Sequence, residues 1–312
     1  VGGIISGDGS GLTNLPTSYD RIVYVSEAGS DSNDGSFTNP LATISGALVY
    51  VKANYTVSES VLIEVGPGSY PQDLTIDRYN TYIKSAAGRY EQKQVSVTGK
   101  TVISATGTVR SNHIVGIEGI FFNYSSATYP TINVSGTVET TVYLKDCYVA
   151  ANGSNSLKVQ GITSNNGKVV LDKSYFLSQK GTADNIRIEG GYVKADSIEV
   201  SYPNTVNAGT GSGIYITGNS SFVADRLLVE LPSIVTGSSI IANATTYISN
   251  ASLSSSLTAP NGAIYVGAGN AAFLYNIIFQ NNYTVKGGSP SFAYYSDLVS
   301  PVGMPTFSVV TP

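Results

Sequence analysis

The chain contains almost none of the residues on which thiol, metal and imidazole chemistry depend. Among its 312 residues there are one cysteine, one histidine, one methionine and no tryptophan. Because Cys147 is the only cysteine, an internal disulfide and a cysteine-based metal site are both excluded. The absence of tryptophan removes the strongest aromatic platform for sugar rings. We therefore predict neither a metal nor another cofactor.

Charge and long apolar runs are also scarce. Charged residues make up 12% of the chain and the net charge is −4, which argues against nucleic acid as a partner, since such binders carry clustered Lys and Arg. No apolar run approaches the roughly 20 residues that span a bilayer, so membrane insertion is not expected. No signal peptide is recognisable and the chain does not begin with Met, and we expect a processed or trimmed piece of a longer polypeptide.

An eight-residue pattern recurs along the chain: apolar, any, apolar, any, any, apolar, any, apolar. Successive copies start 27, 27, 24, 29, 24 and 26 residues apart. A period in this range indicates a solenoid, in which each repeat stacks on the previous one and all share one core. The seven copies begin at Val115, Val142, Val169, Val193, Phe222, Thr246 and Ala272.

The spacing within one repeat predicts strands rather than helices. Alternation at both ends of the pattern indicates two short strands separated by a bend, with positions 1, 3, 6 and 8 pointing inward. Cys147 is at position 6 and should be buried. A further short strand precedes most copies, for example Ile186–Ile188 and Ile214–Ile216. The repeat therefore predicts an all-β, single-stranded parallel β-helix. About nine coils between Val61 and Asn282, stacked at about 4.8 Å, would form a rod of roughly 45 Å.

Residues 22–70 differ from the repeat. Tyr24-Val25 is followed by Asp34-Gly35, by Ala42-Thr43-Ile44 and by Gly66-Pro67-Gly68-Ser69-Tyr70. At these residues the chain resembles the N-terminal entry of the pectin-lyase-like right-handed β-helix superfamily. The resemblance implies a right-handed helix and a short capping helix at residues 21–60, followed by the β-helix at 61–282. It implies no particular activity, because the superfamily includes lyases, hydrolases and non-catalytic virion spikes.

The two ends of the chain have their own composition. Ile4–Pro16 (IISGDGSGLTNLP) resembles short linker motifs of bacteriophage tail fibres and other viral fibrous proteins. We interpret residues 1–20 as a linker that attaches the chain to other virion proteins. The repeat fades after Asn282, and residues 283–312 are predicted to be a cap or extended tail over the last coil.

Positions 2 and 7 of the repeat should face solvent, yet many of them are apolar or aromatic. Large exposed apolar patches usually mark an interface. We therefore predict lateral packing with identical rods as a homotrimer, and the alternative is cover by the chain's own loops or tail. The interface candidates are Tyr143, Val170, Val223, Tyr247 and Phe273 at position 2, and Tyr148 and Tyr175 at position 7.

Position 4 places Asp172, Asp196 and Asp225 in one column on three successive coils. Neighbouring carboxyls would be about 5 Å apart and the outer pair about 10 Å, close to the separations used by retaining and inverting glycosidases. This column is the candidate for catalysis or calcium binding. The competing interpretation is a solvated charge ladder, since Lys145 occupies the same column one coil earlier.

Other features argue against catalysis. The Gly-His-Gly, Asn-Thr-Asp and Asp-Asp elements of the hydrolases in the superfamily are missing, as is the calcium cluster with a nearby arginine that pectate lyases use. His113 is expected to be structural rather than a general base. The segment Asp31–Gly35 looks faintly like a calcium loop, but its spacing is wrong for an EF-hand, and a capping turn is the better interpretation.

These observations favour a non-enzymatic virion fibre or spike on the particle surface, which recognises a host-surface polysaccharide. The alternatives are a tailspike depolymerase or secreted polysaccharide lyase or hydrolase acting through the aspartate column, and a bacterial surface adhesin. The virion interpretation places the protein outside the cell.

Overall fold

The structure is a computed structural model. Of the predicted linker, only residues 18–20 are among those described. The described residues are 18–88, 94–105, 113–135, 140–160, 168–203, 206, 208–256, 258–280, 284–288, 292–299 and 306–310.

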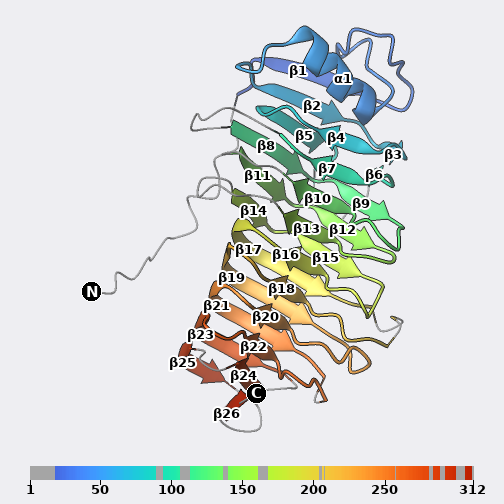
Figure 1. Cartoon of the computed structure of the whole chain (residues 1–312). Helices are drawn as coiled ribbons and strands as arrows, with labels where there is room; N and C mark the ends of the chain where they lie inside the picture. The colour runs from blue at the N-terminus through green and yellow to red at the C-terminus, as the bar shows by residue number, and fades with distance from the viewer. Residues whose placement is uncertain are drawn as a thin grey trace.

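The described strands stack into three parallel faces, which the chain visits in the same order in every coil (Figure 1). Face 1 consists of β1 (Arg21–Val25), β2 (Val61–Val65), β5 (Thr81–Ser85), β8 (His113–Glu118), β11 (Thr140–Lys145), β14 (Lys168–Asp172), β17 (Gly191–Ser201), β19 (Ser220–Glu230), β21 (Thr245–Ser254), β23 (Ala271–Phe279) and β25 (Phe292–Val299). Face 2 consists of β3 (Gly68–Tyr70), β6 (Val95–Val97), β9 (Phe121–Tyr124), β12 (Tyr148–Ala151) and β15 (Tyr175–Ser178), continued by the second halves of β17, β19, β21 and β23.

Face 3 is a separate sheet of short strands. It is formed by β4 (Leu74–Ile76), β7 (Thr101–Ile103), β10 (Ile132–Ser135), β13 (Leu157–Gln160), β16 (Ile186–Ile188), β18 (Ile214–Ile216), β20 (Ile240–Ala242), β22 (Ile264–Val266), β24 (Thr284–Gly288) and β26 (Thr306–Val310).

This architecture confirms the predicted right-handed parallel β-helix. Face 1 has nine strands from β2 to β23, one for each of the nine coils predicted between residues 61 and 282. The repeat positions are in register, so that Val142, for example, lies between Val115 and Val169. Inward positions form one continuous core, and Phe122, Phe176, Phe222 and Phe279 are among its largest fully buried side chains.

The core includes Cys147, which is 0% exposed as predicted. Burial raises the pKa of its thiol to about 12, so this residue behaves as a small apolar side chain. Each fully buried Val, Leu, Ile or Phe contributes roughly 1.5–3 kcal/mol. The repeat therefore supplies stability evenly along the rod.

The bend between faces 1 and 2 has a backbone conformation that the pattern alone did not predict. Position 5 of every copy has a positive φ, from 47° at Lys173 to 74° at Gly119. A left-handed residue turns the chain sharply without interrupting the stack, and it favours Gly, Asn or Asp. The column consists of Gly119, Asp146, Lys173, Ser197, Arg226, Asn250 and Asn276.

The N-terminal cap forms as the resemblance implied. Helix α1 (Ile44–Asn54) lies against the first coil and buries Ile44, Ala47 and Val51. Its N-cap Thr43 accepts a hydrogen bond from the Gly46 N–H at 2.8 Å, which satisfies one free donor of the first turn. Within the described residues no helix has the length and apolar character needed to cross a bilayer.

The end of the rod requires a correction to the predicted boundary. Strands β24, β25 and β26 continue faces 1 and 3 in parallel register. The residues predicted to be a cap or tail, 283–312, therefore contribute further strands to the solenoid. The eight-residue spacing is lost there because a parallel ladder needs only backbone donors and acceptors, not the full apolar pattern.

Candidate functional site

The predicted aspartate column exists. Asp172 pairs in register with Asp196, and Asp196 with Asp225, at the last face 1 position before the left-handed bend. Adjacent strands of a sheet are about 4.8 Å apart, so the three carboxyls occupy neighbouring levels of one corner of the rod. The three residues nevertheless have different surroundings.

Asp172 is a buried carboxyl, with 8% of its surface exposed. Burial raises its pKa, and Asp196 and Asp146 raise it further, against the opposing effects of Lys173 and Lys145. A carboxyl with a raised pKa is one ingredient of a general acid. This is the observation that keeps the catalytic interpretation of the column open.

Asp196 and Asp225 are occupied by hydrogen-bond donors of the same corner. The Arg226 guanidinium donates to the Asp196 carboxylate at 2.5 Å, and Ser197 Oγ donates to it at 3.0 Å. Asp225 Oδ1 accepts from Ser249 Oγ at 2.8 Å and from Asn250 Nδ2 at 2.6 Å. The side chain of Asp196 is only 6% exposed. Its carboxylate is therefore not open to a substrate in this conformation.

Toward the N-terminal end of the rod, the same column is a chain of ion pairs. Glu118 lies between Lys84, at 3.7 Å, and Lys145, at 3.3 Å. Among the described residues there is no group of three or more His, Cys, Asp or Glu side chains arranged to hold a metal ion, so calcium binding gains no support. The column is a charge ladder in which Glu118, Asp196 and Asp225 have polar or charged partners. The expected solvation is wrong for Asp172 and Asp196, which are buried.

Two residues that sequence reasoning considered for chemistry have structural environments. His113 is 7% exposed and its ring stacks on Tyr79, with the ring centroids 3.7 Å apart. The Asp31 carboxylate accepts hydrogen bonds from the Ala42 and Thr43 N–H groups at 3.0 and 2.9 Å and from Thr43 Oγ1 at 2.8 Å. Asp31 thus holds the start of α1 in place, which confirms the interpretation of this segment as a capping turn.

The solvent-facing position predicted for Tyr143 and Val170 is wrong. Tyr143 is 8% exposed and Val170 4%, and the two pack with Ile114 in a small cluster outside the main core. Two coils from Tyr143 toward the N-terminus, Tyr19 covers Tyr82, with ring centroids 5.0 Å apart. The outward residues of face 1 in register with Tyr143, from Leu62 to Val170, are therefore buried by the chain itself, because apolar side chains on neighbouring strands and segments bury one another there.

The other interface candidates retain some exposure. Tyr247 is 42% exposed and stacks on Phe273 with centroids 4.5 Å apart and planes 6° apart. Val223, one coil above, is half-buried. On face 2, Tyr148 and Tyr175 are half-buried and their ring centroids are 4.6 Å apart. These residues form ladders along the rod.

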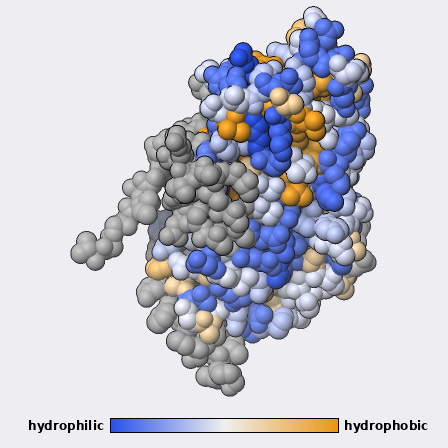
Figure 2. All heavy atoms as spheres, turned by 45° about the horizontal axis from the view of Figure 1, so that its top comes forward, coloured by the Kyte–Doolittle hydropathy of each residue, from blue (hydrophilic) through white to orange (hydrophobic). Residues whose placement is uncertain are grey.

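Apolar residues also reach the surface of the N-terminal cap. Figure 2, which brings this end forward, shows small orange patches between hydrophilic residues there. Phe37 is 76% exposed and Val49 is 68% exposed. Their positions lie outside the repeat, so the repeat pattern did not indicate them.

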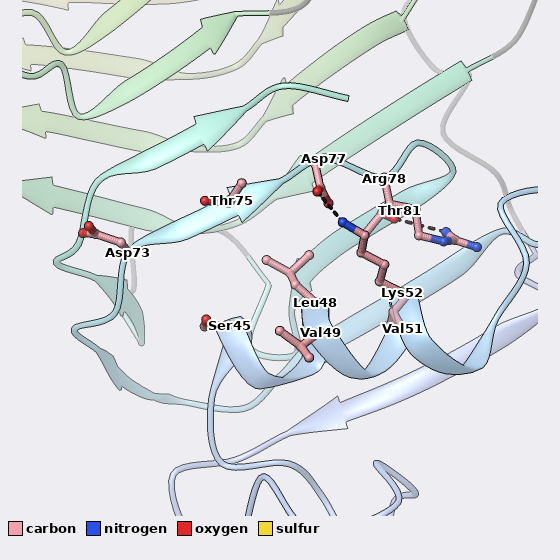
Figure 3. A pocket seen from close by; sticks show the side chains of 10 residues that line it. All are labelled: Ser45, Leu48, Val49, Val51, Lys52, Asp73, Thr75, Asp77, Arg78 and Thr81. Carbon is pink, nitrogen blue, oxygen red and sulfur yellow. Dashed lines mark hydrogen bonds and ion pairs between the residues drawn. The ribbon is translucent and has the colours of Figure 1, made fainter. Parts of the chain in front are cut away.

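A small hollow of about 200 Å³ lies between α1 and β4. Figure 3 shows Lys52 and Asp77 pointing toward each other across it, and their side chains form an ion pair at 2.6 Å. The buried Arg78 donates hydrogen bonds to backbone carbonyls, including those of Thr56 and Glu59. Arg78 thus links the segment after α1 to the segment after β4, whereas the side chains of the Lys52–Asp77 pair are 63% and 40% exposed.

Face 3 carries an outward column of long side chains that sequence reasoning missed. We call it the face 3 track, and its six members lie on six successive strands of face 3: β13, β16, β18, β20, β22 and β24. All six are half-buried, so each keeps part of its surface in solvent. At about 4.8 Å per coil the track is roughly 24 Å long. Its members are Lys158, Arg187, Tyr215, Ile241, Tyr265 and Lys286.

The contacts along the track combine charge, hydrogen bonding and aromatic surface. The Arg187 guanidinium lies over the Tyr215 ring, 4.6 Å from its centroid. Asn243 Nδ2 donates to Tyr215 Oη at 3.3 Å. The sequence contained a pattern that could have located the track. In the triplets Ile-Arg-Ile, Ile-Tyr-Ile and Ile-Tyr-Val, two inward apolar residues flank a middle residue that must point outward.

Comparisons with known proteins bear on the fold. No protein-family model and no curated protein matches the chain. Among solved structures, pectate lyase Pel9A is similar with a TM-score of 0.51 and 14% identity, over 90% of this chain and 79% of that one. Pectin methylesterase PemA from Erwinia chrysanthemi has a TM-score of 0.47 and 14% identity, over 91% and 81%. ORF18 of Geobacillus virus E2 has a TM-score of 0.32 and 13% identity, over 93% and 61%.

Identities this low speak to fold alone, since one fold hosts many activities. The register of the coils, the single helix over the first coil and the likeness to pectate lyase agree with one another. The chain has a right-handed parallel β-helix fold similar to that of pectate lyase Pel9A.

Proposed function

We propose that this protein is a structural fibre or spike of a virion, such as a phage tail or another appendage, and that it binds a host-surface glycan through the face 3 track. The observation that carries the proposal is the track itself, with two tyrosines, an arginine, an isoleucine and two lysines on consecutive coils.

The track has the properties of a binding surface for an extended polymer. Tyrosine offers an apolar ring and a polar hydroxyl at low conformational cost. Tyr, Trp and Arg dominate the residues on which binding energy depends. Because Tyr215 and Tyr265 are two coils apart, a chain lying along the rod would meet two aromatic surfaces about 10 Å apart. This separation suits a polysaccharide better than a compact ligand.

The test is a binding measurement on a panel of host-surface polysaccharides with the whole chain and single variants. Tyr215→Ala should weaken binding about tenfold or more, the effect of losing a binding hot spot. Tyr275→Ala is the matched control, because Tyr275 is 54% exposed but lies on face 1. If the protein bound no polysaccharide of the panel, or if both variants behaved alike, the proposal would fail.

The second candidate is a depolymerase, polysaccharide lyase or hydrolase acting through Asp172, Asp196 and Asp225. The raised pKa of Asp172 next to Asp196 favours it, since carboxyls in unlike environments can divide acid and base roles. Incubation with the bound polysaccharide, followed by assays for new reducing ends and unsaturated products, tests this function. Activity that disappears in Asp196→Ala would replace the binding proposal, whereas unchanged polymer would eliminate the enzyme. A surface adhesin is the third candidate, and genomic neighbours would identify it.

We also propose that the rods associate as a homotrimer, with residues 1–20 attaching the chain to other virion proteins. The ladder of Val223, Tyr247 and Phe273, in which Tyr247 is 42% exposed, supports lateral packing on the lower half of face 1. Sedimentation equilibrium should give three times the chain mass, and Tyr247→Asp should reduce it. A monomer at micromolar concentration would contradict this assembly.

A further inference from the structure

One carboxylate occupies the space between the two cations at the upper end of the face 3 track. Glu189 Oε2 accepts from Lys158 Nζ at 2.9 Å, and Glu189 Oε1 accepts from Arg187 Nε at 2.6 Å. Arg187 Nη1 also donates to Asp184 Oδ2 at 2.8 Å. Two cations therefore face two carboxylates, and the group has no net charge.

The arrangement has the form of a carboxylate-binding site that is already filled. Arginine and lysine side chains converging on one carboxylate are the usual means of binding an acidic group. Here that carboxylate belongs to the protein, one position beyond β16, in which Arg187 is the outward residue. An acidic sugar would have to displace Glu189 and then lie beside two unpaired carboxylates.

We propose that Glu189 is a specificity-determining residue, which fills the anion position between Lys158 and Arg187 and so makes the track select neutral glycans over acidic ones. This inference rests on the proposed glycan-binding function and names the chemical class of its ligand. Neutral sugar hydroxyls can hydrogen-bond to the paired side chains without breaking the pairs, and the rings of Tyr215 and Tyr265 supply the apolar contact.

Two further observations support the selection of neutral glycans. The side chains of Lys158, Arg187 and Glu189 are 25%, 34% and 27% exposed, so a ligand can reach them. Burial opposes ionisation of Glu189, but the hydrogen bonds and charges of Arg187 and Lys158 outweigh it and lower its pKa below the ordinary value. Glu189 therefore stays anionic in mildly acidic solution. The net charge of −4 also repels polyanions at long range.

The test compares polygalacturonate with the same polymer after full methyl esterification, alongside the polysaccharide panel. The wild-type chain should bind neutral glycans and should not bind polygalacturonate at physiological ionic strength. Glu189→Gln removes the charge and keeps the size, so it should bind polygalacturonate at least about tenfold more tightly, because a hydrogen bond to a charged group is worth about 1.5–3 kcal/mol. This gain should weaken with added salt and be absent for the methyl ester.

One control and one second variant keep the result interpretable. Glu199→Gln changes a half-buried glutamate on face 2, away from the track, and should gain nothing. Glu189→Ala serves as a second variant if the glutamine variant folds poorly. The inference is overturned if the wild type binds polygalacturonate, or if neither Glu189 variant binds it more tightly. In that case, Tyr215-dependent binding of other glycans would still support the proposed function. Absence of all glycan binding by the wild type overturns both.

Discussion

Removal of Arg226 should destabilise the coils around the aspartate corner more than the exposure of its side chain suggests. Arg226 is 56% exposed, but its partner Asp196 is 6% exposed. Loss of one partner from a fully buried ion pair costs about 3–5 kcal/mol, and an exposed pair contributes about 0.2–1 kcal/mol. Because Asp196 is buried and Arg226 is exposed, we expect Arg226→Ala to cost about 1–3 kcal/mol, between these two ranges. Asp196 loses a charged hydrogen bond at 2.5 Å.

A double-mutant cycle separates the pair from other effects of truncation. Asp196→Asn should cost less than Arg226→Ala, because Arg226 stays half in solvent and within 3.7 Å of Asp225. The double variant should resemble Asp196→Asn, so the coupling energy should equal in size the cost of Arg226→Ala, about 1–3 kcal/mol. The Lys52–Asp77 pair is the control, since its side chains are 63% and 40% exposed, and Lys52→Ala should have little effect.

The assay must be local, because a solenoid of this length need not unfold in two states. Hydrogen exchange of peptides from β17 and β19 reports the free energy of opening for the coils that carry Asp196 and Arg226. Arg226→Ala should accelerate exchange there and leave β2 and β5 unchanged. If the variant exchanged at the wild-type rate, or if the double variant showed additive losses, Arg226 would not be the group that compensates the buried charge of Asp196.

Three further predictions follow from burial and backbone conformation. Burial raises the pKa of Asp172, so its contribution to stability is full below the unfolded-state pKa and is lost as the pH rises through the higher folded-state value. Asp172→Asn should therefore flatten this part of the dependence of the urea midpoint on pH. An unchanged profile would contradict the burial argument. Lys173 has a φ of 47°, so Lys173→Gly should be neutral or stabilise the protein by up to about 1 kcal/mol. Lys168→Gly in β14 is the control and should cost about 0.5–1 kcal/mol. Equal losses of stability in urea unfolding would contradict this account. Cys147 is fully buried, with a pKa of about 12, and should react with a thiol reagent at pH 8 only after unfolding; rapid reaction of the native protein would show that the core opens.

Much of the fold could be predicted because the repeat contains it. Inward residues such as Val142, Leu144 and Val149 alternate with outward ones, and a period near 26 residues brings each copy into register with the next. The same alternation predicted the aspartate column, since position 4 of three copies is Asp. It also placed Cys147 in the core. These properties depend only on spacing, which the chain displays directly.

Features that the repeat did not indicate depend on contacts between residues that are far apart in sequence. Tyr143 and Val170 follow the outward pattern, yet they are buried, because they pack on each other and on Ile114 of a neighbouring coil. Arg226 reaches Asp196 across 30 positions of the chain, and the pattern cannot indicate which donor turns toward which carboxylate. The pairing of Glu189 with both Lys158 and Arg187 is hidden for the same reason.

The sequence by itself determined the solenoid, the inward and outward alternation and the identity of each column, because these follow from the period and from the two-residue alternation of strands. Only the tertiary structure decided which outward residues remain exposed, which carboxylates are paired and which pKa values change. The physical reason is that burial and charge pairing depend on atoms one coil away, about 4.8 Å in space but some 24–29 residues along the chain.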